Sequence, residues 1–143
     1  MNFPYKRYST QILRPVIPIT LKNGSESVRY EVLVDSGADI CLFDAEIGEL
    51  LGLEVLTGEK STVGGVAGQT SEFYIHPIEL EIGGLSFFIK AGFLPDVTQG
   101  FRYGVVGQQG FFDHFVVSFD LAREEIDLQP DVWESGLHRW MGK

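Results

Sequence analysis

Alternation of apolar and polar residues, which is typical of a half-buried β-strand, dominates the chain. The alternation is clearest over residues 78–82, where Ile and Leu side chains take turns with glutamates. The same pattern predicts strands over residues 28–34 and 115–121, and two glycines at 83–84 predict a hairpin turn into a strand over residues 85–91. We therefore expect a mostly β fold of short antiparallel strands, arranged as a barrel or a sandwich.

Helical patterns are scarce in the sequence. Asp44 is a suitable N-cap for a short helix over residues 45–51, and Gly52 is a suitable residue to end it. A second brief helix is expected over residues 110–114. The 17 glycines and 6 prolines predict many turns, which leaves room for one or two short helices only.

Length and composition indicate a single domain over residues 1–143. Hydrophobic residues make up 44% of the chain, which excludes a disordered protein. The net charge of −9 argues against nucleic acid as a partner, because proteins that bind it normally carry a basic surface. No internal repeat, low-complexity stretch or linker divides the sequence.

The cysteine content and the hydrophobic pattern also bear on location. Cys41 is the single cysteine, so no internal disulfide can form, which fits a reducing compartment. No secretory signal is recognisable, and no apolar stretch approaches the roughly 20 residues that a membrane span requires. We therefore expect a soluble, cytoplasmic protein without a membrane partner.

Residues 1–30 form a basic arm in an otherwise acidic chain. The arm has five basic side chains and one acidic side chain, Glu26. Two interpretations of this arm are open. Either its charges are solvated, or the arm docks on an acidic neighbour such as a second copy of the chain.

Residues 32–39, Val-Leu-Val-Asp-Ser-Gly-Ala-Asp, are the most informative segment for chemistry. Here an apolar strand runs directly into the carboxylate of Asp35. An unpaired carboxylate at the end of a buried strand costs several kcal/mol, so a function or a local hydrogen bond must offset it. The alternative to a function is an Asx or Ser-Gly turn, in which Asp35 only accepts hydrogen bonds from nearby backbone amides.

Two further segments are rich in glycine. Residues 62–70 form a tip between two expected strands, and they lack the Lys-Ser/Thr of a phosphate-binding loop. The tip suits a hairpin that closes over an extended ligand, and an ordinary surface hairpin is the alternative. Residues 103–112 place a short apolar strand before a glycine and the second expected helix.

These three segments, in this order and at these separations, resemble the single-domain aspartic proteases of the retroviral type, the retropepsin-like family. The resemblance covers residues 26–121, and it leaves residues 1–20 and 122–143 as arms whose role it does not define. It implies a closed barrel of short antiparallel strands with one or two short helices and a flap hairpin.

The resemblance also implies an activity. In this family two carboxylates from Asp-Thr/Ser-Gly loops share a proton and activate one water, which hydrolyses a peptide bond without a metal or other cofactor. This chain contains the motif once, so the implied aspartic endopeptidase is a homodimer to which each chain contributes Asp35. A catalytically silent module that binds peptides or dimerises is the alternative.

Other site residues follow from the resemblance, position by position. Ser36, Gly37 and Ala38 are the expected supporting loop, and Asp39 matches the residue that receives substrate backbone amides. The expected flap, which also binds substrate, consists of Val63, Gly64, Gly65, Val66, Ala67 and Gly68. The expected loop behind the catalytic turn consists of Val105, Val106 and Gly107.

The sequence departs from the retroviral pattern at Gln108. Retroviral enzymes commonly have Arg at this position, paired with the Asp after Ala, whereas Gln108 can hydrogen-bond to Asp39 but cannot neutralise it. The departure bears on dimer stability and on substrate choice. Other chemistries find less support, because Cys41 beside His76 or His114 is better interpreted as a core thiol, and the histidines lack metal-ligand spacing.

Overall fold

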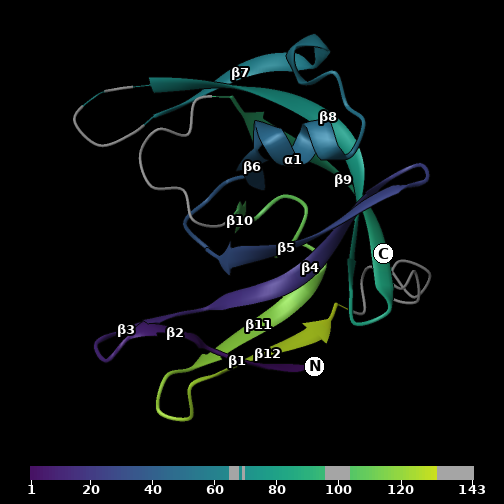
Figure 1. The fold of residues 1–143 in the computed structure, drawn as a ribbon. Helices are drawn as coiled ribbons and strands as arrows, with labels where there is room; N and C mark the ends of the chain where they lie inside the picture. The colour runs from purple at the N-terminus through teal and green to yellow at the C-terminus, as the bar shows by residue number, and fades with distance from the viewer. Residues whose placement is uncertain (65–67, 69, 96–103, 132–143) are drawn as a thin grey trace, which may run out of the picture.

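The computed structural model describes residues 1–64, 68, 70–95 and 104–131 of the chain. Over these residues the fold is mostly β, as the sequence predicts (Figure 1). The strands are β1 (Asn2–Pro4), β2 (Lys6–Ser9), β3 (Ile12–Arg14), β4 (Val16–Asn23), β5 (Glu26–Val34), β6 (Leu42–Asp44), β7 (Glu59–Gly64), β8 (Thr70–Ile82), β9 (Leu85–Leu94), β10 (Gly104–Val106), β11 (Phe115–Asp120) and β12 (Glu125–Pro130). The helices are α1 (Ala45–Leu50) and the 3₁₀ helix η1 (Val55–Thr57).

Within the described residues, a seven-stranded sheet forms most of the molecule. Its order is β4-β5-β10-β6-β9-β8-β7, and an additional pairing joins β4 to β8. The strands from β4 to β8 in this order therefore form a closed ring, which is compatible with the expected barrel, and β7 extends the ring as an edge strand. Two pairings in the ring, β5 with β10 and β6 with β9, are parallel.

The strands with the clearest alternation lie where the sequence predicts them. Residues 78–82 of β8 bury their apolar side chains and leave both glutamates half-exposed. Segments 28–34, 85–91 and 115–120 lie within β5, β9 and β11. However, β8 and β9 reach 13 and 10 residues, so they are longer than the alternation alone indicates.

Helix α1 confirms the helix expected after Asp44. The Asp44 carboxylate accepts a hydrogen bond from the Glu46 amide at 2.9 Å, which caps the first turn. Gly52 follows the end of the helix with a φ of +79°, a conformation that favours glycine. Among the described residues, no helix is long and apolar enough to cross a membrane.

The helix expected over residues 110–114 is wrong, because this segment forms turns. Gly110 has a φ of +102°, outside the right-handed helical region. Its amide donates to the Asp113 carboxylate at 3.0 Å, so a local side-chain hydrogen bond replaces a helical start.

The core draws its buried side chains from the ring strands and also from α1, η1, β11 and β12, and it is rich in phenylalanine. Gly104 shows how closely the core packs, because a Cβ there would lie 2.5 Å from the ring of Tyr30 and 2.6 Å from that of Phe43. The largest fully buried side chains are Phe43, Phe93, Phe111, Ile17, Leu21, Leu51, Leu80, Ile126 and Leu128.

Cys41 is part of this core. Its side chain is fully buried, and burial raises the pKa of the thiol to about 12. The Sγ atom donates to the Gln109 carbonyl oxygen at 3.5 Å. These contacts support the interpretation of Cys41 as a core thiol.

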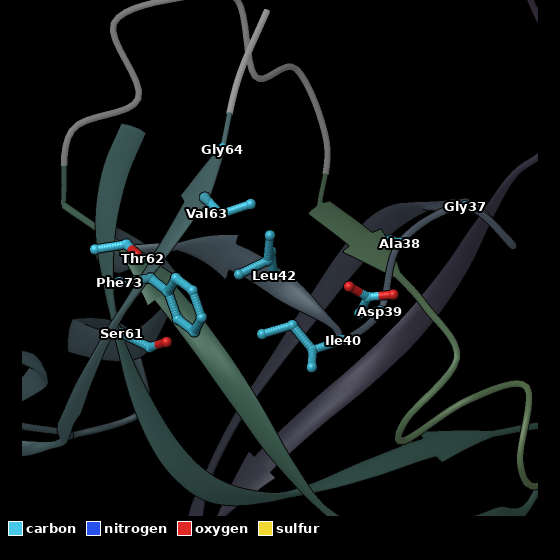
Figure 2. A pocket seen from close by; sticks show the side chains of 10 residues that line it. All are labelled: Gly37, Ala38, Asp39, Ile40, Leu42, Ser61, Thr62, Val63, Gly64 and Phe73. Carbon is cyan, nitrogen blue, oxygen red and sulfur yellow. The ribbon is translucent and has the colours of Figure 1, made fainter. Parts of the chain in front are cut away.

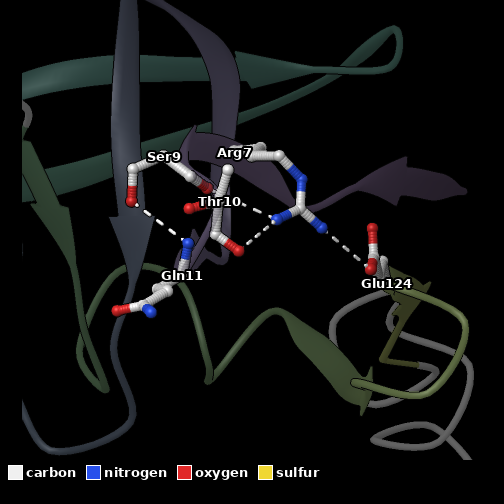
Figure 3. A network of polar contacts seen from close by, with 5 residues as sticks. All are labelled: Arg7, Ser9, Thr10, Gln11 and Glu124. Atoms are coloured by element: carbon white, nitrogen blue, oxygen red, sulfur yellow. Dashed lines mark hydrogen bonds and ion pairs between the residues drawn. The ribbon is translucent and has the colours of Figure 1, made fainter.

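The N-terminal arm folds back onto the rest of the chain. Strand β1 pairs with β12, and β12 pairs with β11, so a three-stranded sheet joins the arm to residues 115–130 (Figure 1). Arg7 approaches the Glu124 carboxylate to 3.1 Å and also donates to the carbonyl oxygens of Ser9 and Thr10 (Figure 3). Further ion pairs join Lys6 to Glu31 and Lys22 to Glu81. The acidic partners of Lys6, Arg7 and Lys22 are therefore residues of the same chain.

Candidate active site

Asp35 lies directly after the last residue of β5, at the start of a tight turn. Val32 and Val34 anchor this end of β5 in the core with exposed fractions of 0% and 3%. The Asp35 amide donates to the Val106 carbonyl oxygen at 3.0 Å, and its Oδ1 accepts the Gly37 amide at 2.9 Å. The Asx turn that the sequence left as an alternative is therefore present. It uses only Oδ1, because Oδ2 has no hydrogen-bond partner among the described residues.

Strand β10 and the residues after it support this turn from behind. Val105 and Val106 pair in parallel with the end of β5. At Gly107 the two segments approach so closely that a Cβ would lie 2.5 Å from the carbonyl oxygens of Ala38 and Ile40. Thus the three residues expected behind the catalytic turn lie there, and the third is a glycine for a steric reason.

Hydrogen bonds from the residues after Gly107 hold the turn in place. The Gln108 amide donates to the Ala38 carbonyl oxygen at 2.8 Å, and the Gln109 amide donates to the Asp39 carbonyl oxygen at 2.9 Å. The Gln108 side chain donates through Nε2 to the Ser36 carbonyl oxygen at 2.9 Å. Gln108 therefore supports the turn and does not contact the Asp39 carboxylate, which the sequence had left possible.

A cavity of about 470 Å³ opens beside the turn (Figure 2). We call residues 37–40 its turn wall and residues 61–64, from β7, its β7 wall. Leu42 and Phe73 complete the lining. The cavity begins at Gly37, so Asp35 lies next to the lined volume and is not part of its lining.

The cavity gathers only some of the residues expected to bind substrate. Asp39, Val63 and Gly64 line it, and Gly68 lies elsewhere on the hairpin with a φ of +77°. Gly65, Val66 and Ala67 lie outside the described residues.

Sequence reasoning missed Ile40, Leu42, Ser61, Thr62 and Phe73 as lining residues. The available signal was that all five lie within a few residues of the recognised motifs along the sequence.

The side chains of Phe73 and Leu42 form the floor of the cavity, and Gly92 packs closely against both of them. Both side chains are buried, with exposed fractions of 5% and 9%. A Cβ on Gly92 would lie 2.6 Å from Cδ2 of Phe73 and 2.7 Å from Cδ2 of Leu42. The absence of a side chain at Gly92 therefore makes room for the floor.

The β7 wall presents a strand edge to the cavity. β7 pairs with β8 on one side, and it is the last strand of the sheet in the described residues. Backbone amides and carbonyl groups on its other side can pair with an added strand, so the edge suits an extended peptide. No group of three or more His, Cys, Asp or Glu side chains among the described residues is arranged to hold a metal ion.

Comparisons with known proteins bear on the fold. No family model matches the chain, and no curated protein matches it. A solved structure described as a retropepsin-like aspartic protease from Rickettsia conorii matches with a TM-score of 0.64 and 17% identity, over 90% of this chain and 89% of that one. EIAV protease in complex with an inhibitor gives a TM-score of 0.49 and 19% identity, over 72% of this chain and 88% of that one.

The likeness to the Rickettsia conorii structure extends over nearly the whole of both chains. At this level of identity the likeness concerns the fold, and the chain therefore has the retropepsin-like fold.

Proposed function

We propose that this protein is an aspartic endopeptidase. The observation that carries the proposal is the position of Asp35, held by β10 at the end of β5 beside a cavity bordered by β7, whose second edge pairs with no described strand. Oδ1 is fixed by the turn and Oδ2 remains without a partner among the described residues, so the carboxylate can accept a proton from water.

A single chain supplies one such carboxylate, because its sequence contains the Asp-Ser-Gly motif once. The proposed enzyme is therefore a homodimer in which two Asp35 side chains face each other across a twofold axis. Two carboxyl groups this close do not both ionise, so one is protonated and the other is a base.

The proposed reaction uses both forms of the pair. The ionised Asp35 takes a proton from water as the water oxygen attacks the peptide carbonyl carbon. The protonated Asp35 gives its proton to the carbonyl oxygen, which forms a tetrahedral intermediate. The intermediate collapses when the C–N bond breaks: the amine nitrogen receives a proton from the protonated Asp35, and one hydroxyl of the intermediate gives its proton to the ionised Asp35, so the pair again holds one proton.

The neighbouring residues have proposed roles in keeping this geometry. A Cβ at Gly37 would lie 3.2 Å from Oδ1 of Asp35, so glycine keeps that oxygen uncrowded. Ser36 and Ala38 hold the turn to Gln108, which follows β10, through their carbonyl oxygens. The β7–β8 hairpin is the proposed flap, and Val63 and Gly64 are its described contacts with the cavity.

The test is cleavage of an unstructured peptide library by the wild type and by Asp35→Asn, from acidic to neutral pH. Asn keeps the shape of Asp but can act neither as the base nor as the proton carrier, so we expect hydrolysis to be abolished. Circular dichroism and analytical ultracentrifugation check that the fold and dimer persist. Specific activity should also fall on dilution, following dissociation of the dimer.

Undiminished cleavage by highly purified Asp35→Asn would overturn the assignment of Asp35. Binding of peptides without cleavage by the wild type would instead support the silent module. We propose the cytoplasm as the location of the protein, because the single cysteine, Cys41, requires no oxidising compartment.

A further inference from the structure

Asp39 has a fixed backbone and an unpaired charge. Its carbonyl oxygen accepts the Gln109 amide, which ties the residue to the segment after β10. Its exposed carboxylate forms no hydrogen bond or ion pair with a described residue. Gln108, the nearest candidate partner from the sequence, uses its side-chain amide on the Ser36 carbonyl oxygen instead.

Apolar side chains line the cavity around this carboxylate, together with the hydroxyl side chains of Ser61 and Thr62. Figure 2 shows Asp39 beside Ile40 on one side, Phe73 across from them, and Leu42 between. No lysine, arginine or histidine lines the cavity, so Asp39 provides its only charged side chain among the described lining residues. A pocket that combines apolar side chains with a single carboxylate suits a long side chain with an apolar stem and a cationic end.

We infer that this cavity is a specificity pocket for a lysine or arginine side chain of a peptide. The inference rests on the proposed function, in which an extended peptide lies along the free edge of β7. Side chains of an added strand alternate between its two faces, so one of them enters the cavity lined by Val63 and Gly64. Its stem packs on Leu42 and Phe73, and its cationic end pairs with Asp39.

Two general features of the protein strengthen the inference. The net charge of −9 attracts cationic peptides at long range and raises their rate of association. The twofold symmetry of the proposed dimer gives the enzyme two copies of the pocket. A preference for basic side chains is therefore expected at two positions of the substrate, one on each side of the cleaved bond.

The experiment begins with library cleavage by the wild type to find the positions that prefer lysine or arginine. Short synthetic peptides are then made with Lys, Gln or Glu at one such position. Wild type should have a higher kcat/KM for the Lys peptide than for the Gln peptide by about three- to fivefold, the effect of a partly exposed ion pair. The Glu peptide should be cleaved most slowly.

Asp39→Asn should lower the ratio of kcat/KM for the Lys peptide to that for the Gln peptide from three- to fivefold to about one. Glu49→Gln is the matched control. It removes one exposed negative charge from α1, outside the cavity, and should preserve the preference for lysine.

Two results would overturn the inference. An equal loss for all three peptides in Asp39→Asn would mean that Asp39 contacts the peptide backbone. A wild type without any basic preference would mean that the cavity does not select charge.

Binding of the same peptides to Asp35→Asn separates this inference from the proposed function. Suppose that the wild type cleaves no peptide, that Asp35→Asn binds the Lys peptide most tightly, and that the double variant Asp35→Asn/Asp39→Asn loses this preference. The endopeptidase proposal then fails, and the inference about the pocket is supported.

Discussion

The two walls of the cavity are built on different principles. The turn wall, residues 37–40, accepts hydrogen bonds from the backbone amides of Gln108 and Gln109, and Gly107 packs directly against its carbonyl oxygens. The residues just before it are also held, because Asp35 bonds to Val106 of β10 and Ser36 bonds to the Gln108 side chain. Among the described residues, the β7 wall, residues 61–64, is bonded to β8 along one side only. A Cβ on Gly64, at its end, would have no heavy atom of a described residue within 4 Å, apart from its chain neighbours.

This difference matches the different demands of chemistry and recognition. A reacting carboxylate must be held within a fraction of an ångström, and dense contacts provide that precision. A strand edge that receives peptides of many sequences benefits from open space and unpaired backbone groups. The four predictions below test how far the contrast holds.

The largest expected effect comes from Gly107→Ala. The new Cβ would lie 2.5 Å from two backbone carbonyl oxygens, and backbone atoms cannot rotate away as a flexible side chain can. We expect a loss of about 2–3 kcal/mol in the free energy of unfolding, together with loss of peptidase activity. Urea denaturation measures the first effect.

Gly64→Ala is the matched control, because it adds the same methyl group to the other wall in open space. It should change stability by less than about 0.5 kcal/mol. Equal destabilisation by the two substitutions would abolish the contrast between the walls.

A smaller effect is expected from Gly92→Ala, beneath the floor that joins the two walls. Its Cβ would meet side-chain atoms of Phe73 and Leu42 at 2.6 and 2.7 Å, and these atoms can move by rotation. We expect a loss of about 1–2 kcal/mol in stability. Phe73→Leu in the same chain should recover part of it, and a double-mutant cycle by urea denaturation measures the recovery. A purely additive double variant would show that the contact with Phe73 is not the cause.

Alkaline pH should weaken the protein through Cys41, whose thiol supports the segment behind the turn wall. The pKa of this thiol is raised from 9.0 to about 12 in the folded protein, so its contribution to stability is complete below pH 9 and is lost as the pH rises from 9 to 12. Between pH 8 and 10 the stability of the wild type should fall by roughly 1 kcal/mol relative to Cys41→Ala. Chemical denaturation of both proteins at several pH values tests this, and parallel pH profiles would contradict it.

The smallest effect is expected at Gln108. Gln108→Met removes the hydrogen bond from Nε2 to the Ser36 carbonyl oxygen, and exposure of this pair to solvent limits the loss to about 0.5–1 kcal/mol. Gln109→Met is the control, because Gln109 supports the turn wall through its main-chain amide. If thermal unfolding shows no difference between the two variants, the side chain of Gln108 contributes nothing to the turn wall.

Local sequence patterns predict many of the strands and the helix α1. Residues 78–82 alternate strictly because one face of β8 lies on the core and the other faces water, and the Asp44 carboxylate caps α1 within two residues of itself. Such features depend on near neighbours, so the sequence predicts them. The prediction of a helix over residues 110–114 is wrong for a related reason, since the left-handed Gly110 and the Asp113 carboxylate favour a turn at this point.

Contacts between distant segments were harder to foresee. The order of motifs led to the retropepsin-like fold, but no local pattern shows that Phe73 and Leu42 share a floor above Gly92. Likewise, the choice of Gln108 between Ser36 and Asp39 depends on side-chain geometry across the loop. That choice leaves Asp39 unpaired, and the inference about substrate charge depends on it.

The insertion of β10 into the ring has a consequence for the order of folding. β10 lies between β5 and β6, although both precede it by a long stretch of chain, and Gln108 and Ser36 are 72 positions apart. Contacts of such high sequence separation require closure of a long loop, which makes them slow to form. The hairpin of β8 and β9 can form early from neighbouring residues, whereas the support behind Asp35 can form only after residues 104–109 have been synthesised and have found their place. A nascent chain therefore acquires the proposed catalytic geometry late, when most of its other strands are already available.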